Sequence, residues 1–335
     1  MKIAIINSSH PVYNLAIDRM QYKLGQTNEV IRSGKFDMFQ VKCDEAYISA
    51  IFTWDLPRLI YDVKAMKEVG IPNIQIGGPA VTAMADYVEQ ETGLPVVRGL
   101  DQRFEIADGN YLTTFTSRGC PRACEFCLVP KLEGRKMVEY DNFPIPTGVN
   151  PWVCDNNILA TSWQHQTLVV DKLRHIKNLD INSGFDDRIF LKNPDKYWDL
   201  YSQLHLERWR FAYDKPEQRD AIKQCSDFLH NKNIRYSNIS VFCLIGGYGE
   251  TFDEARERLE YLISIDVTPY PQRYKPLNSL TRDYNPPNWK NGAIELLFQF
   301  YGVPNMWRSM KWEEFIHKDK KAGDYQGMKE VTDVI

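Results

Sequence analysis

Three of the chain's seven cysteines, Cys120, Cys124 and Cys127, lie within one stretch of eight residues. They directly follow segment 111–115, whose residues favour a β-strand. Iron–sulfur clusters are held by cysteine thiolates, normally four of them. Three ligands leave one iron free, much as an open coordination position marks a catalytic zinc site. The spacing therefore predicts an iron–sulfur cluster with one open position.

The same triad fits two other interpretations, a zinc site completed by a distant fourth ligand and three unrelated thiols. The remaining cysteines are scattered and show no spacing for a second cluster, which favours buried core thiols. They are Cys43, Cys154, Cys225 and Cys243.

The expected compartment follows from the thiols and from the lack of long apolar segments. No apolar run approaches the ~18 residues that a membrane-spanning helix needs. The apolar segment 3–6 is too short for a signal peptide and predicts a first strand instead. In the cytoplasm thiols stay reduced, so a local cysteine cluster there indicates metal binding or catalysis rather than disulfides. We therefore expect a cytoplasmic protein without a membrane partner.

The charge balance bears on the class of substrate. The 335 residues include 41 Lys and Arg against 44 Asp and Glu, which gives a formal net charge of −3. Such a total lacks the basic excess of a dedicated nucleic-acid-binding protein, although a local basic groove would not show in it. A small-molecule or peptide substrate is favoured over duplex nucleic acid, and a nucleotide substrate stays open.

The first hundred residues alternate between short apolar strands and helical patterns. Strands are expected at 2–6, 47–52 and 74–76, with amphipathic helices between them. Strand–helix–strand units of this length imply right-handed crossovers and a parallel sheet. Gly77 and Gly78 end the third strand, where they serve either a tight turn or a ligand, because ligands bind beyond the carboxyl ends of such sheets. We predict a Rossmann-like domain over residues 1–106.

A second run of alternating strands and helices follows from residue 107. Six βα units fit a partial (β/α)6 barrel of the TIM type better than an open sheet, and we place this barrel at 107–284. The Trp-rich stretch 285–335 is expected to form a helical C-terminal cap, which completes an α/β fold. The six strand segments are 111–115, 152–154, 179–181, 209–213, 239–245 and 268–274.

The pattern Cys-x3-Cys-x-Phe-Cys after a first barrel strand resembles the signature of the radical S-adenosylmethionine (SAM) superfamily. The resemblance implies a [4Fe–4S] cluster on the three thiolates, with the amino and carboxylate groups of SAM on the fourth iron. One electron, from a donor such as flavodoxin or ferredoxin, would cleave SAM to methionine and a 5′-deoxyadenosyl radical. That radical abstracts hydrogen from the substrate. Phe126 is expected to pack near the adenine.

The resemblance also assigns SAM contacts to the ends of later strands. Polar residues after the second and third strands would contact the amino and carboxylate groups of SAM, and a glycine pair after the fifth would lie along the adenosine. Turn formation, exposed ion pairing and a bulge are the structural alternatives. The assigned residues are Asp155, Asn156, Asn157, Asn182, Arg188, Gly246 and Gly247.

The first domain resembles the cobalamin-binding-like domain of some radical SAM enzymes. The usual Asp-x-His-x-x-Gly motif is absent, since the first loop, 7–12, is Asn-Ser-Ser-His-Pro-Val. Its absence argues against bound cobalamin and leaves cobalamin-dependent methylation as the alternative within this class. Methylthiotransferases carry a second cysteine triad in this domain, whereas only Cys43 is present here. A zinc-binding regulatory module without catalysis is the alternative from another class.

Overall fold

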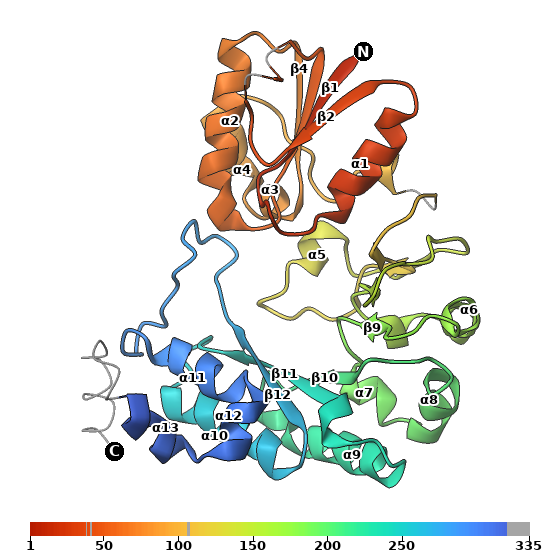
Figure 1. Cartoon of the computed structure of the whole chain (residues 1–335), viewed down its shortest axis with the longest axis vertical. Coiled ribbons are helices and arrows are strands. Elements are labelled where there is room, and N and C mark those ends of the chain that lie inside the picture. Colours follow the sequence, from red (N-terminus) through yellow and green to blue (C-terminus); the bar gives the residue numbers. More distant parts are fainter. Residues whose placement is uncertain (38, 41, 106–107, 320–335) are drawn as a thin grey trace. The chain divides into compact units, whose positions relative to one another are not determined.

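The computed structural model of the chain describes residues 1–37, 39–40, 42–105 and 108–319 (Figure 1). It contains two compact units, Met1–Leu173 with Pro276–Arg282, and Arg174–Lys275 with Asp283–Ile335. The predicted boundary at 106/107 and the last part of the predicted cap, 320–335, lie outside the described residues. The boundaries of the three predicted domains stay predictions.

The N-terminal part of the first unit is a parallel sheet with the strand order β2-β1-β3-β4. Three of its strands were predicted from the sequence. The fourth, at the β2 edge, was not, because its residues are charged or polar at three of five positions and only partly buried. The strands are β1 (Lys2–Asn7), β2 (Glu29–Ser33), β3 (Glu45–Ser49) and β4 (Asn73–Gly77).

Helices cover both faces of this sheet (Figure 1). Successive residues of a strand point to opposite faces, so Ile3 and Ile5 pack with Ile17 of the first helix, while Ala4 and Ile6 belong to the cluster that contains the second helix. This two-sided burial produces the expected Rossmann-like layers. The helices are α1 (Leu15–Gly25), α2 (Leu56–Glu68), α3 (Pro79–Ala83) and α4 (Ala85–Thr92).

The rest of the first unit carries the beginning of the barrel on very short strands. β5 pairs with β8 in parallel, and β6 pairs with β7 in antiparallel fashion. Each of these strands has only two residues, fewer than the sequence predicted for the first and second barrel strands. The elements are β5 (Thr113–Thr114), β6 (Ser117–Arg118), α5 (Val129–Leu132), β7 (Val138–Glu139), β8 (Trp152–Val153) and α6 (Trp163–Leu173).

The second unit continues the alternation of strands and helices. β10, β11 and β12 form a parallel sheet in that order. The helix after β11 begins with a capping box in which Thr251 accepts from the backbone of Glu254. The elements are β9 (Asp180–Ile181), α7 (Asp187–Phe190), α8 (Pro194–Tyr201), β10 (Trp209–Ala212), α9 (Arg219–Asn231), β11 (Ile239–Ile245), α10 (Phe252–Ser264), β12 (Thr268–Arg273), α11 (Ala293–Tyr301), α12 (Pro304–Ser309) and α13 (Trp312–Asp319).

Single turns of 3-10 helix join several of these elements. They are Thr53–Asp55, Gln102–Phe104, Ile158–Ala160, Pro216–Gln218 and Tyr236–Asn238. All six predicted barrel strands occur at their predicted positions, and the predicted α/β class is confirmed. Within the described residues, no helix has both the length and the apolar character that a membrane crossing requires.

Candidate active site

The three cysteines lie on the loop between β6 and α5, and the backbone shapes that loop closely. Cys120 is buried, while Cys124 and Cys127 are partly exposed. The Cys127 amide donates to the Cys124 carbonyl at 3.0 Å, and the Val129 amide donates to Cys127 Sγ at 3.4 Å. Gly119 has φ +84°, and a Cβ there would lie 2.2 Å from the Lys136 carbonyl oxygen. Only glycine lets the chain enter the loop in this way.

The thiols of this loop act on one another electrostatically. Burial raises the pKa of the Cys127 thiol, the Val129 amide opposes the rise, and the charges of Cys124 and Cys120 add to it. Among the residues that the structure describes, no three His, Cys, Asp or Glu side chains gather closely enough for a single metal ion. The donor set is three thiolates on one loop, and soft sulfur ligands of this kind suit an iron–sulfur cluster. The residues therefore fit the predicted cofactor.

A wholly buried carboxylate, Asp155 at the end of β8, holds the chain between β5 and β6. It accepts hydrogen bonds from the amides of Thr116 and Ser117 at 2.6 and 3.1 Å, and from both of their hydroxyls. Burial raises the pKa of Asp155, and these four hydrogen bonds oppose that rise. Both carboxylate oxygens thus serve the base of the cysteine loop, while the predicted contact of Asp155 with SAM stays a prediction.

A buried histidine extends this support. His165 of α6 lies with Nε2 3.0 Å from Thr116 Oγ1, the hydroxyl that also donates to Asp155. Burial lowers the pKa of His165, although the charges of Asp155 and Glu139 oppose this. A neutral imidazole in this position can donate its Nε2 hydrogen to the threonine oxygen. The sequence analysis did not single out His165.

A second carboxylate, Glu133, holds the two ends of the cysteine loop together. It accepts from Arg118 Nη1 at 3.0 Å, from the Gly119 amide at 2.9 Å and from Asn156 Nδ2 at 2.6 Å. Its side chain is only 3% exposed. The amide of Asn156 therefore joins the loop to the end of β8, and Asn157 beside it is buried. The predicted contacts of these two asparagines with SAM stay predictions.

Arg118, two residues before Cys120, is buried between two carboxylates. Its Nε and Nη2 donate to the two oxygens of Glu105 at 3.0 and 2.8 Å, a bidentate pair. Its guanidinium also lies 3.5 Å from the centre of the Phe115 ring. The acidic partners raise the pKa of Arg118 against the effect of burial. The motif is flanked by Arg118, Glu105 and Glu133. Their spacing in the sequence does not indicate that they form ion pairs.

The other predicted SAM residues belong to the second unit. Asn182 is exposed, and Arg188 is 52% exposed with Nε donating to Asp186 at 3.2 Å, which is the ion pair named above as the alternative. A Cβ on Gly246 would lie 2.6 Å from Pro286, and one on Gly247 would lie 2.9 Å from Tyr274. The glycine pair thus permits close packing inside its own unit. That these residues join Phe126, which is partly buried, at one SAM site stays a prediction.

Comparison with known proteins identifies the fold. No protein-family model matches the chain. A curated relative from Oryza sativa subsp. japonica, described as a CDK5RAP1-like protein, is 27% identical over 176 residues, which cover 50% of this chain and 26% of the relative. The chain thus matches only about a quarter of that relative's length.

Two solved structures of TsrM from Kitasatospora setae, described as a radical S-adenosylmethionine methyltransferase, are similar to this chain. The first holds a tryptophan substrate and the SAM analogue aza-SAM. It has a TM-score of 0.60 at 11% identity and covers 83% of this chain and 75% of that one. The second holds cobalamin and a [4Fe–4S] cluster. It has a TM-score of 0.59 at 11% identity and covers 83% and 77% of the two chains.

The comparison with solved structures shows the fold, and the cysteine loop has a defined place in that fold. The chain has a radical SAM fold, as the similarity over 83% of its length shows. The Cys-x3-Cys-x-Phe-Cys loop follows the first barrel strand of this fold. The expectation against cobalamin gains no support, because one structural neighbour is described with cobalamin bound.

Proposed function

We propose that the chain binds a [4Fe–4S] cluster through Cys120, Cys124 and Cys127 and modifies a substrate by hydrogen abstraction. The observation that carries this proposal is a three-thiol loop, clamped at its base by buried carboxylates, in a chain with the radical SAM fold. When bound, the cluster and SAM supply one-electron cleavage of SAM to methionine and a 5′-deoxyadenosyl radical.

The chain's own residues would hold and orient these groups. Asp155 and Glu133 accept from the Ser117 and Gly119 amides and so fix the backbone that leads into Cys120, which would orient this end of the loop for metal binding. We assign SAM contacts to Phe126, Asp155, Asn156 and Asn157 in the first unit. We assign further contacts to Asn182, Arg188, Gly246 and Gly247 in the second. The electron donor would be of the flavodoxin or ferredoxin class, and the substrate a small molecule, nucleotide or peptide.

Cobalamin-dependent methylation is a second candidate, favoured by the likeness to a methyltransferase structure that holds cobalamin. The ligand would lie at the carboxyl ends of the first unit's parallel strands, as is general for such sheets. That edge carries the buried polar side chains of Asn7, Ser8 and Ser49. A titration with hydroxocobalamin followed by visible absorbance tests this. Saturable binding would support methylation, and no binding would remove it.

The central test is release of 5′-deoxyadenosine after anaerobic cluster reconstitution with SAM and a strong reductant. We expect release from the unchanged chain, and none from Cys124→Ala, which removes one cluster ligand. Cys43→Ala is the matched control, because Cys43 is buried in the core of the N-terminal sheet. Equal release from both variants would contradict the ligand assignment. Zinc in place of iron in anaerobically purified protein would favour the regulatory module.

A further inference from the structure

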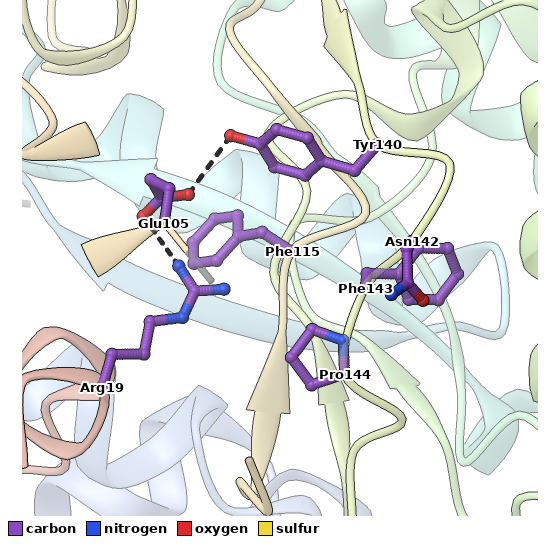
Figure 2. A pocket seen from close by; sticks show the side chains of 7 residues that line it. All are labelled: Arg19, Glu105, Phe115, Tyr140, Asn142, Phe143 and Pro144. Carbon is purple, nitrogen blue, oxygen red and sulfur yellow. Dashed lines mark hydrogen bonds and ion pairs between the residues drawn. The ribbon is translucent and has the colours of Figure 1, made fainter. Parts of the chain in front are cut away.

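A cavity of about 80 Å³ lies within the first unit, apart from the cysteine loop (Figure 2). It is partly open to solvent. Its wall combines one buried ion pair with aromatic rings, and no residue proposed above as a contact of the cluster or SAM contributes to it. The lining residues are Arg19, Glu105, Phe115, Tyr140, Asn142, Phe143 and Pro144.

Arg19 is the residue in this wall whose hydrogen bonds are incomplete. It projects from α1, its side chain is only 3% exposed, and Nη1 donates to Glu105 at 2.7 Å. Its Nε is buried and has no hydrogen-bond partner among the described residues. A buried donor without an acceptor costs free energy, and more so when it is charged. The guanidinium is thus prepared to donate to an acceptor that this part of the chain does not supply.

Glu105 cannot meet that need, because its two oxygens already accept four hydrogen bonds. Arg19 and Arg118 share one oxygen at 2.7 and 2.8 Å, while Arg118 and the Tyr140 hydroxyl share the other at 3.0 and 3.2 Å. One carboxylate therefore serves two guanidinium groups. Arg118 has a second acidic partner in Glu133, whereas Glu105 is the only acidic partner of Arg19 among the described residues. An added anion is best placed beside Arg19.

The remaining wall is apolar except at its rim. Phe115, Phe143 and Pro144 present carbon, and the Tyr140 hydroxyl is already bonded to Glu105. Asn142 is exposed and offers an amide at the edge. A site for one water needs roughly 10–15 Å³, so this cavity has room for a few heavy atoms. Guanidinium groups bind carboxylates through paired N–H donors. The surroundings suit a short organic acid better than a bare inorganic ion.

We propose that this cavity binds the carboxylate end of a small organic acid, with Arg19 as its principal donor and Asn142 at its rim. The bound acid would contact Phe115, whose ring lies against the guanidinium of Arg118. The acid would thus lie beside Phe115 and Arg118, which precede the cysteine loop, without contacting the thiols. The site depends on neither the cluster nor SAM, so it can be tested in metal-free protein and independently of the proposed activity.

Propionate is the probe, and its affinity is measured by saturation-transfer NMR titration of the full chain. We expect saturable binding of propionate, and none of propylamine or propanol at equal concentration. Arg19→Gln should weaken it roughly tenfold or more, as expected for loss of a charged hydrogen bond. Arg98→Gln is the matched control and should change nothing, because Arg98 is half-exposed in a surface ion-pair cluster.

Asn142→Ala keeps the test decisive if Arg19→Gln fails to fold, because Asn142 is exposed. We expect it to weaken propionate binding by a few fold, the value of one hydrogen bond. Absence of saturable propionate binding would overturn the proposal, as would equal weakening by Arg19→Gln and Arg98→Gln. Inorganic phosphate that binds as well as propionate would also overturn it, because the apolar wall would then contribute nothing.

Discussion

The N-terminal sheet and the cysteine-loop region lie in the same unit, yet they are held together differently. The sheet has four parallel strands of five or six residues, with apolar side chains buried on both faces. The region around the cysteines has four strands of two residues each. Buried carboxylates take the place of long strand ladders there, with Asp155 and Glu133 each accepting several hydrogen bonds.

This difference predicts how the two regions respond to substitution. Apolar burial is spread over many contacts, so loss of one methyl group has a modest cost. Substitution of a buried carboxylate has a large effect on stability, because removal of that one group leaves several buried donors without an acceptor. The polar arrangement fixes one shape of the loop, which a site that must position three thiols needs. The sheet should therefore tolerate small substitutions, whereas substitution of either buried carboxylate should disturb the loop. We call these two carboxylates, Asp155 and Glu133, the clamps of the cysteine loop.

The largest effect is expected for Asp155→Ala. Removing this carboxylate leaves the buried amides of Thr116 and Ser117 without an acceptor, so the free energy of unfolding of the first unit should fall by about 3–5 kcal/mol. We also expect much less iron per chain after reconstitution. Thermal unfolding and iron analysis measure the two effects. Asp141→Ala, an exposed acidic position, is the control. Full iron loading of Asp155→Ala would show that the clamp does not shape the loop.

Glu133→Gln should have the next largest effect. It removes the negative charge that pairs with Arg118. We expect the free energy of unfolding to fall by about 2–3 kcal/mol and the iron content to fall in part. Glu91→Gln breaks the exposed pair with Lys64 and should cost less than ~0.5 kcal/mol without loss of iron. Denaturant unfolding with iron analysis compares the two variants. Equal costs would mean that burial does not distinguish these ion pairs.

Ile48→Val tests whether a small change in the core of the sheet leaves the cysteine loop unaffected. Ile48 is buried in the core beneath α2, and loss of one methylene should cost about 1 kcal/mol. Iron loading should stay at the level of the unchanged chain, because the cysteine loop keeps its clamps. A melting curve and an iron assay on the same preparation measure both quantities. Loss of iron here would indicate that the sheet and the loop depend on each other.

The smallest effect concerns pH. Burial lowers the pKa of His165 below its usual 6.5, with the charge of Lys172 acting in the same direction and those of Asp155, Glu139 and Asp141 opposing it. Below pH 6.5 the unfolded chain therefore binds a proton that the folded chain does not, so stability falls as pH drops. From pH 7.5 to 5.5 we expect a loss of less than ~1 kcal/mol from this residue.

His165→Gln should flatten this part of the pH profile, whereas His175→Gln, at an exposed position, should leave it unchanged. Melting temperatures at pH 7.5, 6.5 and 5.5 supply the comparison. Identical slopes for His165→Gln and the unchanged chain would show that the buried histidine does not contribute.

Local patterns explain which parts of the fold the sequence predicted. Apolar runs with regular spacing marked three strands of the N-terminal sheet and the positions of the barrel strands, and the Cys120–Cys127 spacing marked a loop for which metal binding stays a prediction. The edge strand β2 was missed because Glu29–Ser33 is partly charged and only partly buried. Parallel pairing of β1 with β2 requires a partner 27 positions away, and short-range patterns do not report it.

The buried polar contacts of the first unit could not be predicted, because they join residues that are far apart in the sequence. Asp155 bonds to an amide 39 positions away, and Arg19 bonds to a carboxylate 86 positions away. A single aspartate, arginine or glutamate in a sequence resembles any exposed charge until its partner is known. The predicted SAM residues share this difficulty. Asp155 bonds to Ser117 before the cysteine loop, and Asn156 bonds to Glu133 after α5.

Electron paramagnetic resonance of the anaerobically reconstituted and reduced chain, without and with SAM, tests the central claim most directly. That claim is that three thiolates hold a four-iron cluster with one iron open to SAM. It predicts a reduced [4Fe–4S] signal with about four iron atoms per chain, and a change in that signal when SAM is added. A cluster signal that SAM leaves unchanged, or bound zinc without any signal, would contradict it.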